Sequence, residues 1–202
     1  MKEMKKWKIV ALCTVLACLS IVASGTLAYF TAQETAHNVI TSGGVAIQLI
    51  ELSDNGGDGL TYWRDVEGVM PGAEISKIVI VRNTGASEAW VRVKVDKTVI
   101  LANKDKGNPE VMKLYNNTGD SEWIEQDGYE GTFWIEHDGY YYYKNPLAPG
   151  DETPALFTTV TFDAVKMDND YQSCKAYIDV KADAVQVANN GTSALTATGW
   201  PE

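Results

Sequence analysis

Residues 89–100 place the strongest constraint on the fold, because apolar and polar side chains alternate along them. One side of an extended chain would carry Val91, Val93 and Val95, and the other Trp90, Arg92, Lys94 and Asp96. A period of two marks a β-strand with one face in a core, since successive side chains point to opposite faces. We therefore expect a strand whose second face meets solvent or a neighbouring segment.

Further strand patterns follow along the chain, separated by segments rich in Gly, Asn, Asp and Pro. They fall at residues 45–51, 60–66, 75–81, 157–165 and 174–187, and a run of short antiparallel strands is expected within 122–144. Residues 75–81 are rich in Ile and Val, so we expect one central strand there. The turn Asn83-Thr84-Gly85 should join that strand to residues 89–100 as a pair.

One segment favours a helix instead. Pro109 follows Asn108 as at a first helical turn, and Val111, Leu114 and Tyr115 would share one face of a short helix. About eight strands with little helix predict an all-β fold, namely a jelly-roll or Ig-like antiparallel β-sandwich over residues 41–188. Residues 189–202 form a polar C-terminal tail that we expect to fray, with Trp200 as a candidate for docking.

A near-repeat marks the aromatic part of the chain. Residues 123–129 read Trp-Ile-Glu-Gln-Asp-Gly-Tyr, and residues 134–140 read Trp-Ile-Glu-His-Asp-Gly-Tyr. Each Asp-Gly pair is typical of a two-residue hairpin turn, which needs positive φ. In the run of tyrosines at 140–143, two rings should face inward and two outward.

The aromatic side chains of this region allow two interpretations. A carbohydrate-binding platform would use Trp123, Trp134, Tyr140 and Tyr142. Core packing and cross-strand pairing explain the same side chains without a ligand, because aromatic residues are favoured in strands, and we prefer that interpretation.

The first 28 residues have the pattern of a signal peptide, expected as a cleaved N-terminal signal helix. Residues 1–8 are basic, and Ile9–Ala23 is an apolar run of about 15 residues, shorter than the roughly 20 of a membrane-spanning helix. Thr26 and Ala28 stand at the −3 and −1 positions of a small-residue cleavage site, which predicts a cut before Tyr29. The alternative is an uncleaved anchor, because the apolar run reaches about 22 residues when it is counted past the site.

The charge distribution excludes two classes of partner. Residues 1–28 hold four of the 17 basic and one of the 27 acidic residues, which leaves 13 basic against 26 acidic side chains and a net charge of −13. Such a surface repels nucleic-acid phosphates and anionic lipid headgroups. We expect no nucleic-acid partner, and membrane contact only through an uncleaved signal peptide.

The sequence shows no recognisable catalytic or metal-binding motif. It contains no HExxH, GxSxG or phosphate-binding loop, and the acidic loop 53–59 lacks the EF-hand pattern. Cys174 would be the one cysteine left after cleavage, so we expect a half-buried strand residue and no internal disulfide. Glu125 and Glu136 match within the near-repeat, and solvated strand faces explain them better than a glycosidase cleft does. We expect no enzyme activity, no cofactor and no metal.

Several stretches together resemble the TasA/camelysin-like family of Gram-positive (clostridial) bacteria, whose precursors are processed by a SipW-type signal peptidase. The most specific is the junction 25–31, Gly-Thr-Leu-Ala-Tyr-Phe-Thr, followed by a first mature motif at 38–51. Further blocks that resemble the family lie at 71–72, 83–85, 89–95, 139–143, 147–150, 153–154, 157 and 182–186. The resemblance spans most of the chain.

This resemblance implies a secreted, jelly-roll-like sandwich cut after Ala28. Family members include biofilm matrix fibre subunits, in which the freed N-terminal segment adds as a strand to the neighbouring subunit. That segment would be roughly residues 29–40, beginning with Tyr29, Phe30 and Thr31 and ending with Asn38, Val39 and Ile40. The implied partners are further copies of the chain and the SipW-type signal peptidase. A metallopeptidase activity described for camelysin is not carried over, because the sequence offers no recognisable metal ligands.

Three functions remain as alternatives. The favoured one is a secreted structural protein of the extracellular matrix or cell surface, a fibre subunit that assembles through its mature N-terminal strand. The second is a monomeric surface module that binds carbohydrate or a host protein through the Trp/Tyr cluster. The third is a secreted peptidase.

Overall fold

The computed structural model describes residues 44–54, 56, 59–63, 70–118, 122–125 and 128–201, all in the unit His37–Glu202. The predicted signal peptide, its cleavage site and the assembly segment lie outside these residues. The strands of the described chain are β1 (Ile47–Asp54), β2 (Leu60–Tyr62), β3 (Glu74–Ser76), β4 (Ile78–Asn83), β5 (Ala89–Ile100), β6 (Met112–Asn116), β7 (Glu122–Trp123), β8 (Trp134–His137), β9 (Tyr140–Tyr143), β10 (Thr159–Phe162) and β11 (Lys175–Gln186). Short 3-10 turns follow at η1 (Pro109–Val111), η2 (Asn169–Tyr171) and η3 (Ala194–Thr196).

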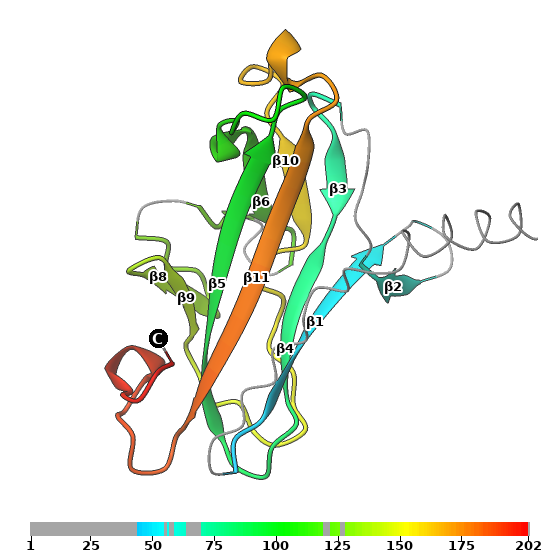
Figure 1. Ribbon diagram of the computed structural model, residues 1–202. Coiled ribbons are helices and arrows are strands. Elements are labelled where there is room, and N and C mark those ends of the chain that lie inside the picture. The colour runs from blue at the N-terminus through cyan, green and yellow to red at the C-terminus, as the bar shows by residue number, and fades with distance from the viewer. Residues whose placement is uncertain are drawn as a thin grey trace, which may run out of the picture. The chain divides into compact units, whose positions relative to one another are not determined.

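Two layers of strands enclose the core (Figure 1). In one layer β11, β5, β9 and β8 lie side by side in that order, and every pair is antiparallel. The other layer combines the sheets β2-β1-β4 and β3-β10-β6-β7, which meet where β3 leads into β4. The core draws on both layers, with Val81 of β4, Val93 of β5 and Val160 of β10 among its members. The prediction of an all-β sandwich is confirmed.

Lys77 divides the stretch that we predicted as one central strand, so that prediction is wrong. Its backbone N–H donates to the carbonyl of Thr158 at 3.0 Å, and Val79 donates to Phe157 at 3.1 Å. Residues 153–158 therefore run along β4 before the chain enters β10. The Lys77 side chain is buried and pairs with Glu51 at 2.7 Å. Burial of a charge is tolerated here because the carboxylate of β1 compensates it.

The chain crosses between the two layers after β4, so the predicted pairing of residues 75–81 with 89–100 is also wrong. β4 pairs with β1, whereas β5 pairs with β11 and β9. The connection is fixed by Asn83, whose buried amide nitrogen donates to the carbonyls of Ser87 and Leu147 at 2.8 Å each. Its side-chain oxygen accepts from the backbone N–H of Gly85 at 2.9 Å, so the turn itself forms as expected.

β5 and β11 form the longest ladder of the described chain. Twelve residues of each strand are in register, from Ala89 opposite Gln186 to Ile100 opposite Lys175. The predicted bounds of β5 are confirmed. Val91 and Val93 enter the core, as their alternation predicted, because the inner face of this layer is covered by the opposite layer.

The helix predicted around residues 108–115 is wrong beyond its first turn. Asn108 caps η1 by accepting from the backbone N–H of Glu110, but the turn ends at Val111. Met112 and Leu114 of β6 are both buried, and Lys113 between them is not. This period of two suits a strand, and pairing with β10 outweighs the local helix signal.

The two halves of the near-repeat fold differently. Asp138 and Gly139 both have positive φ, 50° and 77°, and connect β8 to β9 in the predicted hairpin. β7 instead pairs with β6 in the other layer, so the predicted succession of neighbouring strands across 122–144 is wrong at its beginning. Asp127 lies outside the described residues.

Candidate functional site

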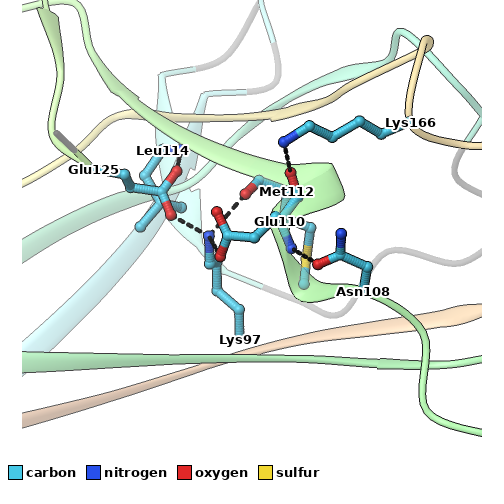
Figure 2. A network of polar contacts seen from close by, with 7 residues as sticks. All are labelled: Lys97, Asn108, Glu110, Met112, Leu114, Glu125 and Lys166. Carbon is cyan, nitrogen blue, oxygen red and sulfur yellow. Dashed lines mark hydrogen bonds and ion pairs between the residues drawn. The ribbon is translucent and has the colours of Figure 1, made fainter.

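A polar network around Lys97 ties β5 to the opposite layer (Figure 2). The ammonium donates to the carbonyl of Met112 at 2.9 Å, is paired with Glu125, and lies 3.4 Å from the carboxylate of Glu110. The second carboxylate oxygen of Glu125 accepts from the backbone N–H of Leu114 at 2.8 Å. Glu125 thus binds the Lys97 ammonium of one layer and the Leu114 backbone N–H of the other.

This network has the features of a structural clamp and lacks those of an acid–base pair. Both carboxylates, Glu110 and Glu125, contact the ammonium of the same lysine. Glu136, the match of Glu125 in the near-repeat, lies in the β8–β9 hairpin and accepts from the backbone N–H of Gly139 at 2.8 Å. The two repeated glutamates therefore have separate local roles.

Tyr141 packs in the core. Burial raises the pKa of its phenol well above the ordinary value near 10, and the negative charges of Glu125, Glu136 and Glu110 raise it further. The side chain consequently remains a neutral phenol under ordinary conditions. Cys174, just before β11, is half-buried as predicted, and burial raises the pKa of its thiol, which disfavours the reactive thiolate.

The C-terminal residues 189–201, which we call the C-terminal clasp, pack onto the outer face of β5 and β9 (Figure 1). Arg92 of β5 is their anchor. Its guanidinium donates to the carbonyl of Pro201 at 2.6 Å and lies 4.0 Å from the ring centroid of Tyr140 and 4.8 Å from that of Trp200. Asp183 of β11, directly across the ladder, pairs with it at 3.0 Å.

Polar bonds within the C-terminal clasp correct the prediction of a frayed tail. Asn190 accepts from the backbone N–H of Thr198 at 2.8 Å and donates to its carbonyl at 3.0 Å. The indole of Trp90 donates to the carbonyl of Asn190 at 2.9 Å, and Ala194 and Ala197 of the clasp are buried in the cluster that contains Trp90 and Tyr142. Small polar residues form an ordered segment here because they bond to one another as well as to the sheet.

The four aromatics predicted as a binding platform are divided among three places. Trp134 is 1% exposed and packs against Tyr143 in the core. Tyr140 and Tyr142 lie on the outer face of β9, under the C-terminal clasp, where Tyr142 meets Trp200 edge-on at 5.8 Å. Trp123 lies on β7 in the other layer and is 41% exposed. The alternation of the tyrosines is confirmed, but these aromatics do not form one surface.

The edge of β11 is the longest strand edge that ends a sheet in the described chain. β11 closes the order β11-β5-β9-β8, and β5 is its ladder partner among the described residues. β1, of the other layer, lies next to it. The inward-facing apolar residues beside this edge are only partly buried, and they are Leu49 of β1, Val95 of β5, and Ala176 and Ile178 of β11. We call this edge and these four side chains the β11 seam.

Two other kinds of functional feature are absent from the described residues. No group of three or more His, Cys, Asp and Glu side chains there is placed to hold a metal ion. No helix of that part is long and apolar enough to cross a membrane.

Sequence reasoning missed the most buried charged groups, Lys77 and Asp183. A charged side chain is ordinarily expected on the surface, so the sequence gives no sign that these two are buried. The charge of each is compensated by an oppositely charged partner that is remote in sequence. Comparison of the chain with protein-family models, with curated proteins and with solved structures found no match.

Proposed function

We propose that this protein is a secreted structural subunit of an extracellular fibre, and that a strand from a neighbouring copy fills the β11 seam. The strand is the mature N-terminal segment, residues 29–40. The observation that carries the proposal is the β11 seam itself: a twelve-residue edge strand beside core side chains that are only partly covered. Secretion and cleavage before Tyr29 rest on the sequence patterns described above.

The edge of β11 would supply the main-chain part of the interaction. An edge strand offers N–H and C=O groups that pair readily with an extended peptide. Segment 29–40 has twelve residues, the same number as β11. At about 3.3 Å per residue, either strand spans about 40 Å, so the two match in length.

The half-covered core residues supply the side-chain part. In an extended segment the even-numbered residues would share one face, because even separations keep side chains on the same side. Four of the six are apolar, namely Phe30, Ala32, Ala36 and Ile40, and the other two are Glu34 and Asn38. The apolar side chains would pack on the partly buried Leu49 and Ile178 of the β11 seam. Burying them is favourable by about 25 cal/mol per Å² of apolar surface.

Assembly should follow from the order of events in secretion. Before cleavage, the segment continues into the apolar run, and its first residue is not a terminus. Cleavage before Tyr29 makes residues 29–40 the N-terminus of the mature chain, and this segment can then extend to a second molecule. The proposal therefore predicts assembly of the mature form and not of the precursor.

Deletion of residues 29–40 from the mature protein tests this mechanism by electron microscopy. The shortened protein should stay monomeric, and a synthetic peptide of residues 29–40 should bind to it and raise its Tm. A second variant replaces Phe30 and Ile40 by Ser, which keeps the length of the segment but removes apolar side chains, and it should assemble more weakly. Filaments that persist after the deletion would rule out the donor-strand mechanism.

A further inference from the structure

The outer face of the sheet β3-β10-β6-β7 carries a straight row of side chains. The ladder register aligns Ser76 with Thr159, Thr159 with Tyr115, and Tyr115 with Trp123. The alternate residues of these strands, such as Val160, lie in the core, so the row points away from it. We call these four residues the outer row.

Trp123 is the most exposed member of the outer row. The ring of Tyr115 meets its indole edge-on, with 4.8 Å between the centroids. Two residues before Tyr115 on β6, the ammonium of Lys113 lies 6.0 Å from the indole centroid and 3.4 Å from the carboxylate of Asp163. The indole is thus positioned by two neighbours while 41% of the residue remains exposed.

The polar groups of the outer row are hydroxyls. Ser76 accepts from the backbone N–H of Asp54 at 2.9 Å, which orients its oxygen and leaves its hydrogen to donate. Tyr115 and Thr159 bring a phenol and a second aliphatic hydroxyl. Hydroxyls both donate and accept, so they suit a ligand that is itself rich in hydroxyl groups.

Charge distinguishes this row from the rest of the molecule. The outer row contains no charged side chain, although the chain carries a net charge of −10. At its flank Lys113 and Asp163 neutralise each other, and the backbone N–H of Val165, with Lys113, holds the pKa of Asp163 below its ordinary value. An uncharged ligand fits such a strip better than an acidic or basic one.

The dimensions of the row indicate a ligand of several units. Three strand spacings separate Ser76 from Trp123, which is about 14 Å. A row of this length can contact more than one unit of a linear polymer. A flat indole also matches the apolar C–H face of a pyranose, while hydroxyls match the rim of the ring.

We propose that the outer row binds a neutral polysaccharide. One sugar ring stacks on the indole of Trp123. The hydroxyls of the following sugars bond to Tyr115, Thr159 and Ser76 in turn. Of the four aromatics suggested by the sequence, this site retains Trp123 alone, and it does not depend on fibre formation.

Affinity gel electrophoresis of the purified protein tests the proposal. Gels would contain hydroxyethyl cellulose, mannan, dextran or the acidic polymer polygalacturonate. At least one neutral polymer should retard the protein, and polygalacturonate should not. Trp123→Ala should weaken the retardation about tenfold or more, as expected for an aromatic anchor. Thr159→Val keeps the strand and the shape of the side chain but removes its hydroxyl, and should weaken binding by a smaller factor.

Tyr177→Ala is the matched control, because Tyr177 is also 41% exposed but lies on β11, outside the outer row. It should bind as the unchanged protein does, and circular dichroism should show that all variants are folded. Retardation by no neutral polymer would overturn the proposal. So would retention by polygalacturonate alone, or equal losses in Trp123→Ala and Tyr177→Ala.

Discussion

Arg92 and Asp183 face each other across β5 and β11, and their side chains form a buried ion pair of 3.0 Å. Asp183 is 1% exposed, and its other carboxylate oxygen has no hydrogen-bond partner but lies 3.9 Å from the ammonium of Lys181. The same guanidinium holds the carbonyl of Pro201. This pair therefore links the central ladder to the C-terminal clasp.

Removal of one partner should strongly destabilise the fold. Asp183→Ala leaves Arg92 buried without its counter-charge, and the free energy of unfolding should fall by about 3 to 5 kcal/mol. Urea denaturation measures this change. Asp179→Ala is the control, because Asp179 is an exposed residue of the same strand and should change stability by less than about 0.5 kcal/mol. Equal effects of the two substitutions would contradict the role given to the pair.

The C-terminal clasp should detach when its aromatic contact is removed. Trp200→Ala loses the contacts with Tyr142 and Arg92, and we expect a loss of about 1 to 2 kcal/mol. Hydrogen exchange should then accelerate at residues 189–201 while the β5–β11 ladder stays protected. Unchanged exchange in the clasp would show that Trp200 does not hold it.

The two glutamates of the near-repeat should differ in their effect on stability. Glu125→Ala removes the partner of Lys97 and of the Leu114 amide, at an expected cost of about 2 kcal/mol. Glu136→Ala removes an exposed hairpin contact and should cost less than about 1 kcal/mol. The comparison is informative because both residues occupy the same place in nearly the same sequence. A larger loss for Glu136→Ala would disprove the clamp.

Alkaline pH should destabilise the protein through Tyr141. The folded-state pKa of this phenol is raised, so its contribution is complete below the unfolded-state value of about 10 and is lost as the pH rises further. Above that pH the unfolded chain releases a proton that the folded chain retains, and stability falls by up to about 1.4 kcal/mol per pH unit. Tyr141→Phe should show a weaker pH dependence between pH 9 and 11. If the free energy of unfolding fell equally with pH in the unchanged protein and in Tyr141→Phe, the role given to Tyr141 would be contradicted.

The sequence predicts those parts of the fold that depend on local residue patterns alone. β5 has the bounds expected from its alternation, because its inner face is buried along much of its length. The Asp138-Gly139 hairpin is likewise local, since two residues with positive φ define it. These features need no knowledge of remote partners.

The features missed depend on contacts between remote residues. Lys77 interrupts a strand pattern because Glu51, far away in sequence, compensates its buried charge. Asn108 does cap a short helical turn, but the residues after that turn form β6 because they pair with β10. The polar sequence of the C-terminal clasp predicts a solvent-exposed tail. Hydrogen bonds from Trp90 and Arg92, which are remote in sequence, hold it on the sheet.

The candidate site shows the same division. The acceptor that we propose for segment 29–40 could not be located from the sequence, because the β11 seam is defined by the order of strands in both layers. The aromatic residues were identified, but their distribution over core, clasp and outer row was not. The near-repeat has one half on each layer, with Trp123 on β7 and Trp134 on β8.

Cross-linking of mixed subunits tests the assembly mechanism most directly. Filaments would be grown from equal parts of 14N- and 15N-labelled mature protein and treated with an amine-reactive cross-linker. The new α-amine of Tyr29 should link to Lys175 or Lys181 on β11, and the linked peptides should include pairs of one light and one heavy chain. Links confined to peptides of the same label, or no link between Tyr29 and β11, would contradict the account.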